Sequence, residues 1–159
     1  MFREMRRFKQ QLPEEKCIEI LKKEPRGVLA VLGDDEYPYT IPLDHFYEDG
    51  KLYFHCAKEG HKLDAIKNSD KCSYCVLANC TPDEDTSAGQ FYYFDSVVVF
   101  GRIRQLEDHD EIIRQVRKLA LKYYTDPDAV EADIRKNGPR TAMLELTIEH
   151  MSGKHVHEK

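Results

Sequence analysis

The chain of 159 residues has the size of one domain, and 41% of its residues are hydrophobic while 33% are charged. This composition excludes a disordered, collagen-like or coiled-coil chain. Twenty-nine Asp and Glu residues against twenty-four Lys and Arg residues give a formal net charge of −5. This charge argues against a broad basic surface for DNA or RNA, and any site for an anion must be local.

The first residues and the cysteines both favour a cytoplasmic protein. Arg3, Arg6 and Arg7 resemble the start of a signal peptide, but polar residues 10–15 stand where its apolar segment would be. The longest apolar run, residues 97–100, is far shorter than the roughly 20 residues of a membrane span. Five cysteines at irregular spacing favour free thiols in a reducing compartment. We therefore expect no association with a membrane.

Short apolar runs alternate with turn residues along the chain, which predicts a single domain spanning residues 1–159. Strands are expected at residues 27–32, 37–47, 51–55, 71–78, 91–106 and 141–150. Helices are expected at residues 13–24, 61–68, 107–123 and 127–137. The remaining segments are an N-terminal arm at residues 1–12, a mobile loop at residues 79–90 and a frayed tail at residues 151–159.

Turn residues and prolines indicate how the first strands are arranged. Residues 33–35 (Gly-Asp-Asp) and the pair Asp49-Gly50 each separate two apolar runs, which is typical of hairpins. Pro38 and Pro42 lack the amide hydrogen that a strand ladder needs. The strand that contains them should therefore run along an edge of the sheet, or leave backbone groups for a partner other than a strand.

Consecutive hairpins, with helical insertions after the third strand and before the last, predict an α+β fold that is mainly β, a mostly antiparallel barrel. The sequence contains no βαβ repeat and no Gly-x-Gly-x-x-Gly motif. A Rossmann dinucleotide site and a P-loop are therefore both excluded.

A loop with Gly60 leads directly into a predicted helix whose first turn contains His61 and Lys62. The free N–H groups of a helix start, its positive dipole end and a lysine together favour an anion such as a phosphate. The alternative is that Lys62 is an ordinary solvated helix residue. The pattern alone leaves both interpretations open.

Five segments, in order along nearly the whole chain, resemble the pyridoxamine 5′-phosphate oxidase-related FMN-binding split-barrel proteins, and most of all the nitroimidazole-resistance subfamily. They are Arg-Gly-Val-Leu-Ala at 26–30, Tyr-Pro-Tyr-x-x-Pro-Leu at 37–43, Asp-Gly-Lys-x-Tyr-Phe-His-x-Ala-x-x-Gly-His-Lys-x-Asp-x-Ile at 49–66, Ser-Val-Val-Val-Phe-Gly at 96–101 and Glu-His-Met-Ser-Gly-Lys at 149–154. The resemblance implies a six-stranded antiparallel split β-barrel with flanking helices, a homodimer, and one FMN in each of two clefts between the subunits.

The resemblance also implies which residues bind the cofactor. A flavin ring needs backbone donors and acceptors, which the proline-interrupted strand offers, and the phosphate fits the anion site at the predicted helix start. Two residues are expected to line the ring or ribityl chain, and two others are expected to come from the partner subunit. The strand residues are Tyr39, Thr40, Ile41, Pro42 and Leu43, the helix-start residues are Gly60, His61 and Lys62, the lining residues are His55 and Ala57, and the partner residues are Ser96 and Val97.

Histidines near the expected site are the candidate catalytic groups. His55 and His61 flank it and could protonate a substrate or stabilise the negative charge of a reduced flavin. His45 is expected to be an ordinary surface residue. A zinc site is not expected, because Cys72 and Cys75 are three apart on a strand and therefore point to opposite faces. The predicted catalytic residues are His55 and His61, with no metal.

The leading functional hypothesis is an oxidoreductase that passes electrons from NAD(P)H through FMN to a small electrophile, with a nitroimidazole or another nitroaromatic as the candidate substrate. The alternative is a non-enzymatic flavin- or haem-binding module that serves in storage or sensing. The pyridoxamine phosphate oxidases proper end in an Arg-rich, Pro-containing segment that binds substrate. Residues 153–159 of this chain do not have that pattern, so oxidation of vitamin B6 is not expected.

Overall fold

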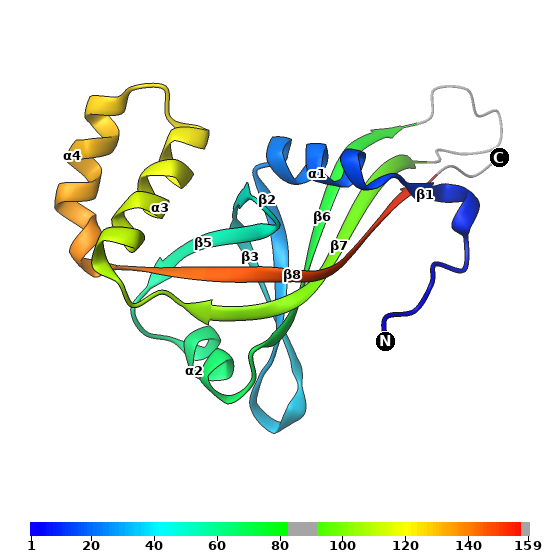
Figure 1. Ribbon diagram of the computed structural model, residues 1–159, viewed down its shortest axis with the longest axis horizontal. Helices are drawn as coiled ribbons and strands as arrows, with labels where there is room; N and C mark the ends of the chain where they lie inside the picture. The colour runs from blue at the N-terminus through cyan, green and yellow to red at the C-terminus, as the bar shows by residue number, and fades with distance from the viewer. Residues whose placement is uncertain (83–91, 157–159) are drawn as a thin grey trace.

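The computed structural model describes residues 1–82 and 92–156 (Figure 1). The helices are α1 (Glu14–Lys23), α2 (His61–Asn68), α3 (His109–Tyr123) and α4 (Pro127–Asn137), with short 3-10 turns at Phe8–Gln10, Asp34–Glu36 and Gly138–Arg140. The strands are β1 (Gln11–Leu12), β2 (Arg26–Leu32), β3 (Pro38–Asp44), β4 (Phe46–Glu48), β5 (Lys51–Ala57), β6 (Lys71–Pro82), β7 (Tyr92–Gln105) and β8 (Thr141–Val156). None of the described helices is long and apolar enough to cross a membrane.

The strands form one antiparallel sheet with the order β3-β2-β6-β7-β8-β5-β4, and β1 pairs with the far end of β8. β3 and β4 follow each other directly in the chain, yet they lie at opposite ends of this order. The sheet must therefore curl until its two edges come near each other, which makes a split barrel (Figure 1). This confirms the predicted fold class.

The prediction of six strands is correct for the long strands and incomplete for the short ones. In the described residues the structure adds β1 and β4, which have two and three residues. The strand expected at residues 37–47 is interrupted at His45, whose amide donates to the Pro25 carbonyl at 3.3 Å. On one side of this break β3 pairs with β2, and on the other side β4 pairs with β5. The break is therefore where the chain passes from one edge of the sheet to the other.

The last strand is longer than predicted. β8 continues from His150 to Val156 because β7 pairs with it as far as Phe94 and Val156, while β1 pairs with Gly153. The expectation of a frayed tail is wrong for residues 151–156, and residues 157–159 lie outside the described part of the chain. The expectation of a loop at residues 79–90 is wrong for residues 79–82, which belong to β6, and residues 83–90 lie outside the described part of the chain.

Glycine allows two close approaches along β7 and β8. A Cβ atom at Gly153 would collide with the Sγ atom of Cys17 in α1 and would lie 2.9 Å from the Cβ atom of Leu12. A Cβ atom at Gly101, where the β7–β8 register shifts, would collide with the Thr147 carbonyl oxygen. The first glycine lets α1 and β1 pack against β8, and the second permits the bulge that bends the long strands.

Two apolar clusters hold the molecule together. The main cluster fills the barrel between the sheet, α1 and α2, and its fully buried members are Leu21, Leu29, Leu52, Phe54, Tyr74, Val76, Val97, Val99, Leu144 and Leu146. A smaller cluster lies under α3 and contains Tyr53, Leu106, Leu119 and Met143. α3 therefore packs against the sheet near β4, β5 and β8, and α4 packs against α3 (Figure 1).

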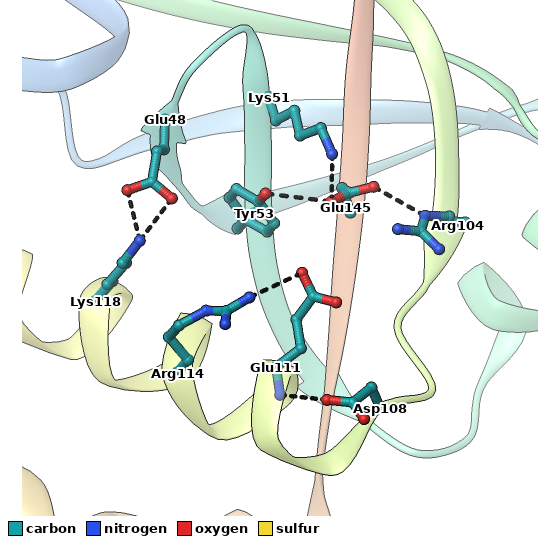
Figure 2. Close-up of polar contacts among 9 residues, drawn as sticks. All are labelled: Glu48, Lys51, Tyr53, Arg104, Asp108, Glu111, Arg114, Lys118 and Glu145. Carbon is teal, nitrogen blue, oxygen red and sulfur yellow. Dashed lines mark hydrogen bonds and ion pairs between the residues drawn. The ribbon is translucent and has the colours of Figure 1, made fainter.

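Polar contacts also attach α3 to the barrel, as Figure 2 shows. The Lys118 ammonium on α3 donates to both carboxylate oxygens of Glu48 on β4, at 2.6 and 2.7 Å. Nearby, the buried carboxylate of Glu145 on β8 accepts from Lys51 at 2.9 Å and from Arg104 at 2.8 Å. The first pair therefore joins α3 to β4, and the two pairs of Glu145 join β8 to β5 and β7.

Candidate functional site

Strand β3 forms one edge of the sheet and contains the residues predicted to face a ring. Tyr39, Ile41 and Leu43 are half-buried against the barrel core, while Thr40 and Pro42 are exposed. Among the described strands, only β2 pairs with β3. The backbone groups on the outer side of β3 therefore have no strand partner in this part of the chain, as the prolines predicted.

The start of α2 offers backbone donors. Gly60 has φ of +126°, a conformation that side chains rarely adopt, and its carbonyl accepts from the amides of Leu63 and Asp64 at 2.9 and 3.3 Å. The two amides before them, those of His61 and Lys62, lie in the first turn, where no intrahelical acceptor exists. The helix start therefore presents two backbone N–H groups and the positive end of its dipole.

Lys62 adds a cation to this helix start. Its side chain is half-buried, and none of the described carboxylates lies within ion-pair distance of it. The Lys62 charge acts on the thiol of Cys56, the penultimate residue of β5. Burial raises the pKa of this thiol, and the positive charge of Lys62 lowers it. Lys62 thus lies beside the end of β5 rather than extending freely into solvent.

His61 connects the helix start to β3. Its imidazole stacks on the Tyr39 ring with centroids 4.2 Å apart and an angle of 23° between the planes. Its Nε2 atom lies 3.5 Å from the Asp34 carboxylate, in the turn between β2 and β3. The structure therefore brings together the strand and the helix start that the sequence predicted as two parts of one site.

The remaining predicted site residues lie on β5 and β7, outside β3 and the start of α2. His55 and Ala57 are exposed on the same face of β5, which contacts β3 and leads to α2 through residues 58–60. Ser96 and Val97 lie on β7, which β6 and β2 separate from β3 in the sheet. Within one chain they do not join the other site residues. Val97 is 0% exposed and belongs to the core cluster, so in the single chain none of its atoms is open to a ligand.

The prediction for His45 is wrong, because this residue is 0% exposed. Its Nε2 atom lies 2.7 Å from the Leu21 carbonyl oxygen and its Nδ1 atom lies 3.0 Å from the Tyr74 hydroxyl. Burial, helped by the nearby Lys122 charge, lowers the pKa of His45 to about 4. The imidazole is therefore a neutral part of the core. Its partners are distant in sequence, so alternation along one strand gave no signal of them.

The cysteines lie as their spacing predicts. Cys72 is buried and Cys75 is half-exposed, on opposite faces of β6. Burial raises the pKa of the Cys72 thiol to about 12. In the described part of the chain, no group of three or more His, Cys, Asp or Glu residues could hold a metal ion.

Sequence reasoning missed an apolar outer face on the sheet. Val28 on β2 pairs with Cys75 on β6, Cys75 pairs with Val98 on β7, and all three side chains are exposed or half-exposed. Leu77 and Phe100 extend this face along β6 and β7 and are also exposed. We call these five residues the outer face. An apolar surface that crosses three strands is typical of an interface rather than of a solvated sheet.

Comparison of the sequence with protein families gives one match of nearly full length. The family described as pyridoxamine 5′-phosphate oxidase matches residues 13–155. These residues include every predicted site residue and both apolar clusters. No sequence among the curated proteins matches the chain.

Solved structures with the same fold include flavin proteins. A candidate 5-nitroimidazole antibiotic resistance protein from Bacteroides thetaiotaomicron has a TM-score of 0.76 at 16% identity, covering 91% of this chain and 86% of its own. A FAD-binding protein from Mesorhizobium loti has a TM-score of 0.64 at 23% identity, with 92% and 97% covered. A FAD- and haem-binding protein from Mycobacterium smegmatis has a TM-score of 0.71 at 19% identity, with 94% and 74% covered. At these identities the likeness establishes the fold.

Proposed function

Because the chain belongs to the pyridoxamine 5′-phosphate oxidase family, we propose that it is a flavoprotein that binds FMN beside β3 and the start of α2. The observation that carries this proposal is the juxtaposition of Lys62, which has no described carboxylate partner, with the first turn of α2 and the edge strand β3. An anion and a planar ring with polar edges are the two chemistries that these groups suit.

The residues present fit the parts of FMN. Lys62 and the amides of His61 and Lys62 would hold the phosphate, since a lysine and a helix start together favour a doubly charged anion. The outer backbone groups of Tyr39 to Leu43 would bond the polar edge of the ring. His55 and Ala57, exposed on β5, would line the ring or the ribityl chain. One cation at one helix start suits a monophosphate, which favours FMN over FAD in this proposal.

A second copy of the chain is part of the proposal. The outer face offers apolar surface for a twofold interface, and Ser96 and Val97 lie among its strands rather than beside β3. In a homodimer the partly exposed Ser96 would complete the cleft of the partner, whereas Val97 stays in the core of its own chain. The single chain supports this arrangement because it brings together only part of the predicted site.

The bound flavin would supply two-electron chemistry, and the protein would orient the ring and hold a proton near it. We propose that NAD(P)H is the electron donor and that a small electrophile such as a nitroimidazole is the acceptor. His55 is exposed beside the proposed cleft and His61 lies in the first turn of α2, so either could donate a proton. Five cysteines without a disulfide support a cytoplasmic location.

A binding module without catalysis is the second candidate, because a structural neighbour with this fold is a FAD- and haem-binding protein. The visible spectrum of the purified protein, followed by titration with FMN, FAD and haemin, separates these ligands. Saturable FMN binding is expected, and haemin binding without FMN binding would overturn the proposal.

Anaerobic mixing of the FMN complex with NADH or NADPH then tests catalysis. Bleaching of the flavin band, with reoxidation by a 5-nitroimidazole, is expected for the oxidoreductase. A flavin that stays oxidised with both donors would instead assign the protein to storage or sensing.

A further inference from the structure

A hollow separate from the proposed flavin site lies between α1, β4 and α3. Its volume is about 490 Å³, and it is lined by Lys22, Phe46, Tyr47, Glu48, Lys118, Leu121 and Lys122. None of these residues belongs to β3, to α2 or to the outer face. The hollow therefore has no role in the proposed binding of FMN.

Three apolar side chains are among the residues that line this hollow. Phe46 and Tyr47 are half-buried at adjacent positions of the short edge strand β4, where Phe46 packs against the cluster under α3 and Tyr47 against the main cluster, and Leu121 is 45% exposed on α3. A single exposed leucine is common on proteins. Here it lines the same hollow as two aromatic side chains, which together offer apolar surface to a ring.

The rim of the hollow is positive. Lys22, Lys118 and Lys122 line it, against the one carboxylate of Glu48. Figure 2 shows that Lys118 is turned toward Glu48, so these two charges offset each other. Neither Lys22 nor Lys122 has an ion-pair partner among the described carboxylates, on a chain whose net charge is −5.

The two remaining lysines are held differently. The Lys122 ammonium donates to the carbonyl oxygens of Glu24 at 2.7 Å and His45 at 3.0 Å, which fixes its position without neutralising its charge. Burial lowers the pKa of Lys122 to about 8, while Asp44 and Glu24 oppose this, so the group is largely charged at pH 7. Lys22 lies over the Tyr47 ring at 5.8 Å from its centroid. Lys22 can therefore turn to an anion at the mouth of the hollow.

We propose that this hollow binds a small aromatic carboxylate, with its ring against the apolar side chains that line the hollow and its carboxylate at Lys22. Apolar contact supplies the affinity of the ring, and the positive rim selects an anion over a neutral or cationic ring. The site binds this class of ligand whether or not flavin is present.

Calorimetric titration with 2-naphthoate and with its neutral analogue 2-naphthamide tests the proposal on the whole protein, with and without FMN. Naphthoate is expected to bind about fivefold more tightly than the amide, the scale of one partly exposed ion pair. The Leu121 methyl signals should shift on titration. Equal binding of acid and amide, or no saturation at millimolar naphthoate, would overturn the site.

Two matched variants locate the charge. Lys22→Met keeps the aliphatic stem and removes the ammonium, while Lys23→Met makes the same change at the next residue, which lines a different hollow. Both lysines are exposed, so both variants should fold. Lys22→Met is expected to weaken naphthoate about fivefold, to the level of the amide, and Lys23→Met to change it less than about twofold. Equal weakening by both variants would mean that the effect is general electrostatics and would contradict the proposal.

Discussion

His45 shows how a single polar residue can belong to the core. Its ring is enclosed by α1, β3 and β6, with the Leu21 carbonyl oxygen on one nitrogen and the Tyr74 hydroxyl on the other. The Tyr74 hydroxyl oxygen lies 2.7 Å from the Leu43 carbonyl oxygen as well, so its one hydrogen serves either that oxygen or the Nδ1 atom of His45. Because a buried polar group without partners is costly, these bonds are what make the position compatible with a histidine.

The stability of the protein should depend on pH through His45. Its pKa is lowered from 6.5 to about 4 in the folded state, so between these values the unfolded chain binds a proton that the folded chain does not. Stability is therefore fully present above pH 6.5 and is lost as the pH falls toward 4, by roughly 3 kcal/mol. Urea unfolding at pH 7, 6, 5 and 4.5 measures this loss.

The variant His45→Gln isolates this contribution from the titration of carboxylates. The gap in unfolding free energy between wild type and His45→Gln should narrow by roughly 3 kcal/mol from pH 7 to pH 4. The exposed His109→Gln should keep the wild-type slope. A gap that stays constant with pH would show that His45 titrates normally.

Residue-level prediction from the sequence succeeded where a local signal exists. Gly60, His61 and Lys62 form the start of α2, because a glycine before an amphipathic helix is a local pattern. The stacking of His61 on Tyr39 and the burial of His45 depend on contacts across the fold. No spacing within one segment encodes such contacts.

At the scale of elements, the attachment of β8 to its neighbours rests partly on one buried carboxylate. Glu145 is 2% exposed and bonds to Lys51, Arg104 and the Tyr53 hydroxyl, the last at 3.2 Å (Figure 2). Burial raises the pKa of Glu145, but the two cations outweigh it and hold the pKa below its ordinary value. The charged form is therefore the one that the fold stabilises.

Replacing this carboxylate should be costly. Glu145→Gln keeps the shape but leaves Lys51 and Arg104 without their common anion, so a loss of about 2 kcal/mol in unfolding free energy is expected. Glu149→Gln on the same strand breaks the exposed pair with Arg102 and should cost less than about 1 kcal/mol. Chemical denaturation of both variants measures the two losses in unfolding free energy. Equal losses would mean that burial adds nothing to the Glu145 interaction.

The order of elements was largely predictable because strand alternation and helix periodicity are local. The errors lie in segments that become strands only because a neighbouring strand pairs with them. β1 and β4 are too short to show a pattern, and residues 151–156 are too polar to predict a strand without knowing that β7 lies beside them. The break at His45 likewise follows from the closure of the barrel, which a single segment does not reveal.

At the scale of the whole molecule, the outer face predicts a twofold homodimer. Sedimentation at micromolar concentration should give about twice the chain mass of 18.6 kDa. Val28→Glu should shift the protein toward the monomer, because it places a charge in the apolar outer face. Tyr124→Glu, at an exposed position outside this face, should leave the dimer intact. A wild-type monomer that binds FMN at full affinity would contradict both the dimer and the shared cleft.

The most direct measurement is the affinity of FMN and of riboflavin for the wild type and for Lys62→Ala. Lys62 at the start of α2 should hold the phosphate, so the variant should lose about ten- to a hundredfold in FMN affinity, the scale of a charge-assisted hydrogen bond. Riboflavin, which lacks the phosphate, should bind both proteins alike, and Lys67→Ala, on the same helix and paired with Asp64, should bind FMN as the wild type does. Unchanged FMN affinity in Lys62→Ala, or an equal loss for riboflavin, would contradict the assignment of the phosphate to this helix start.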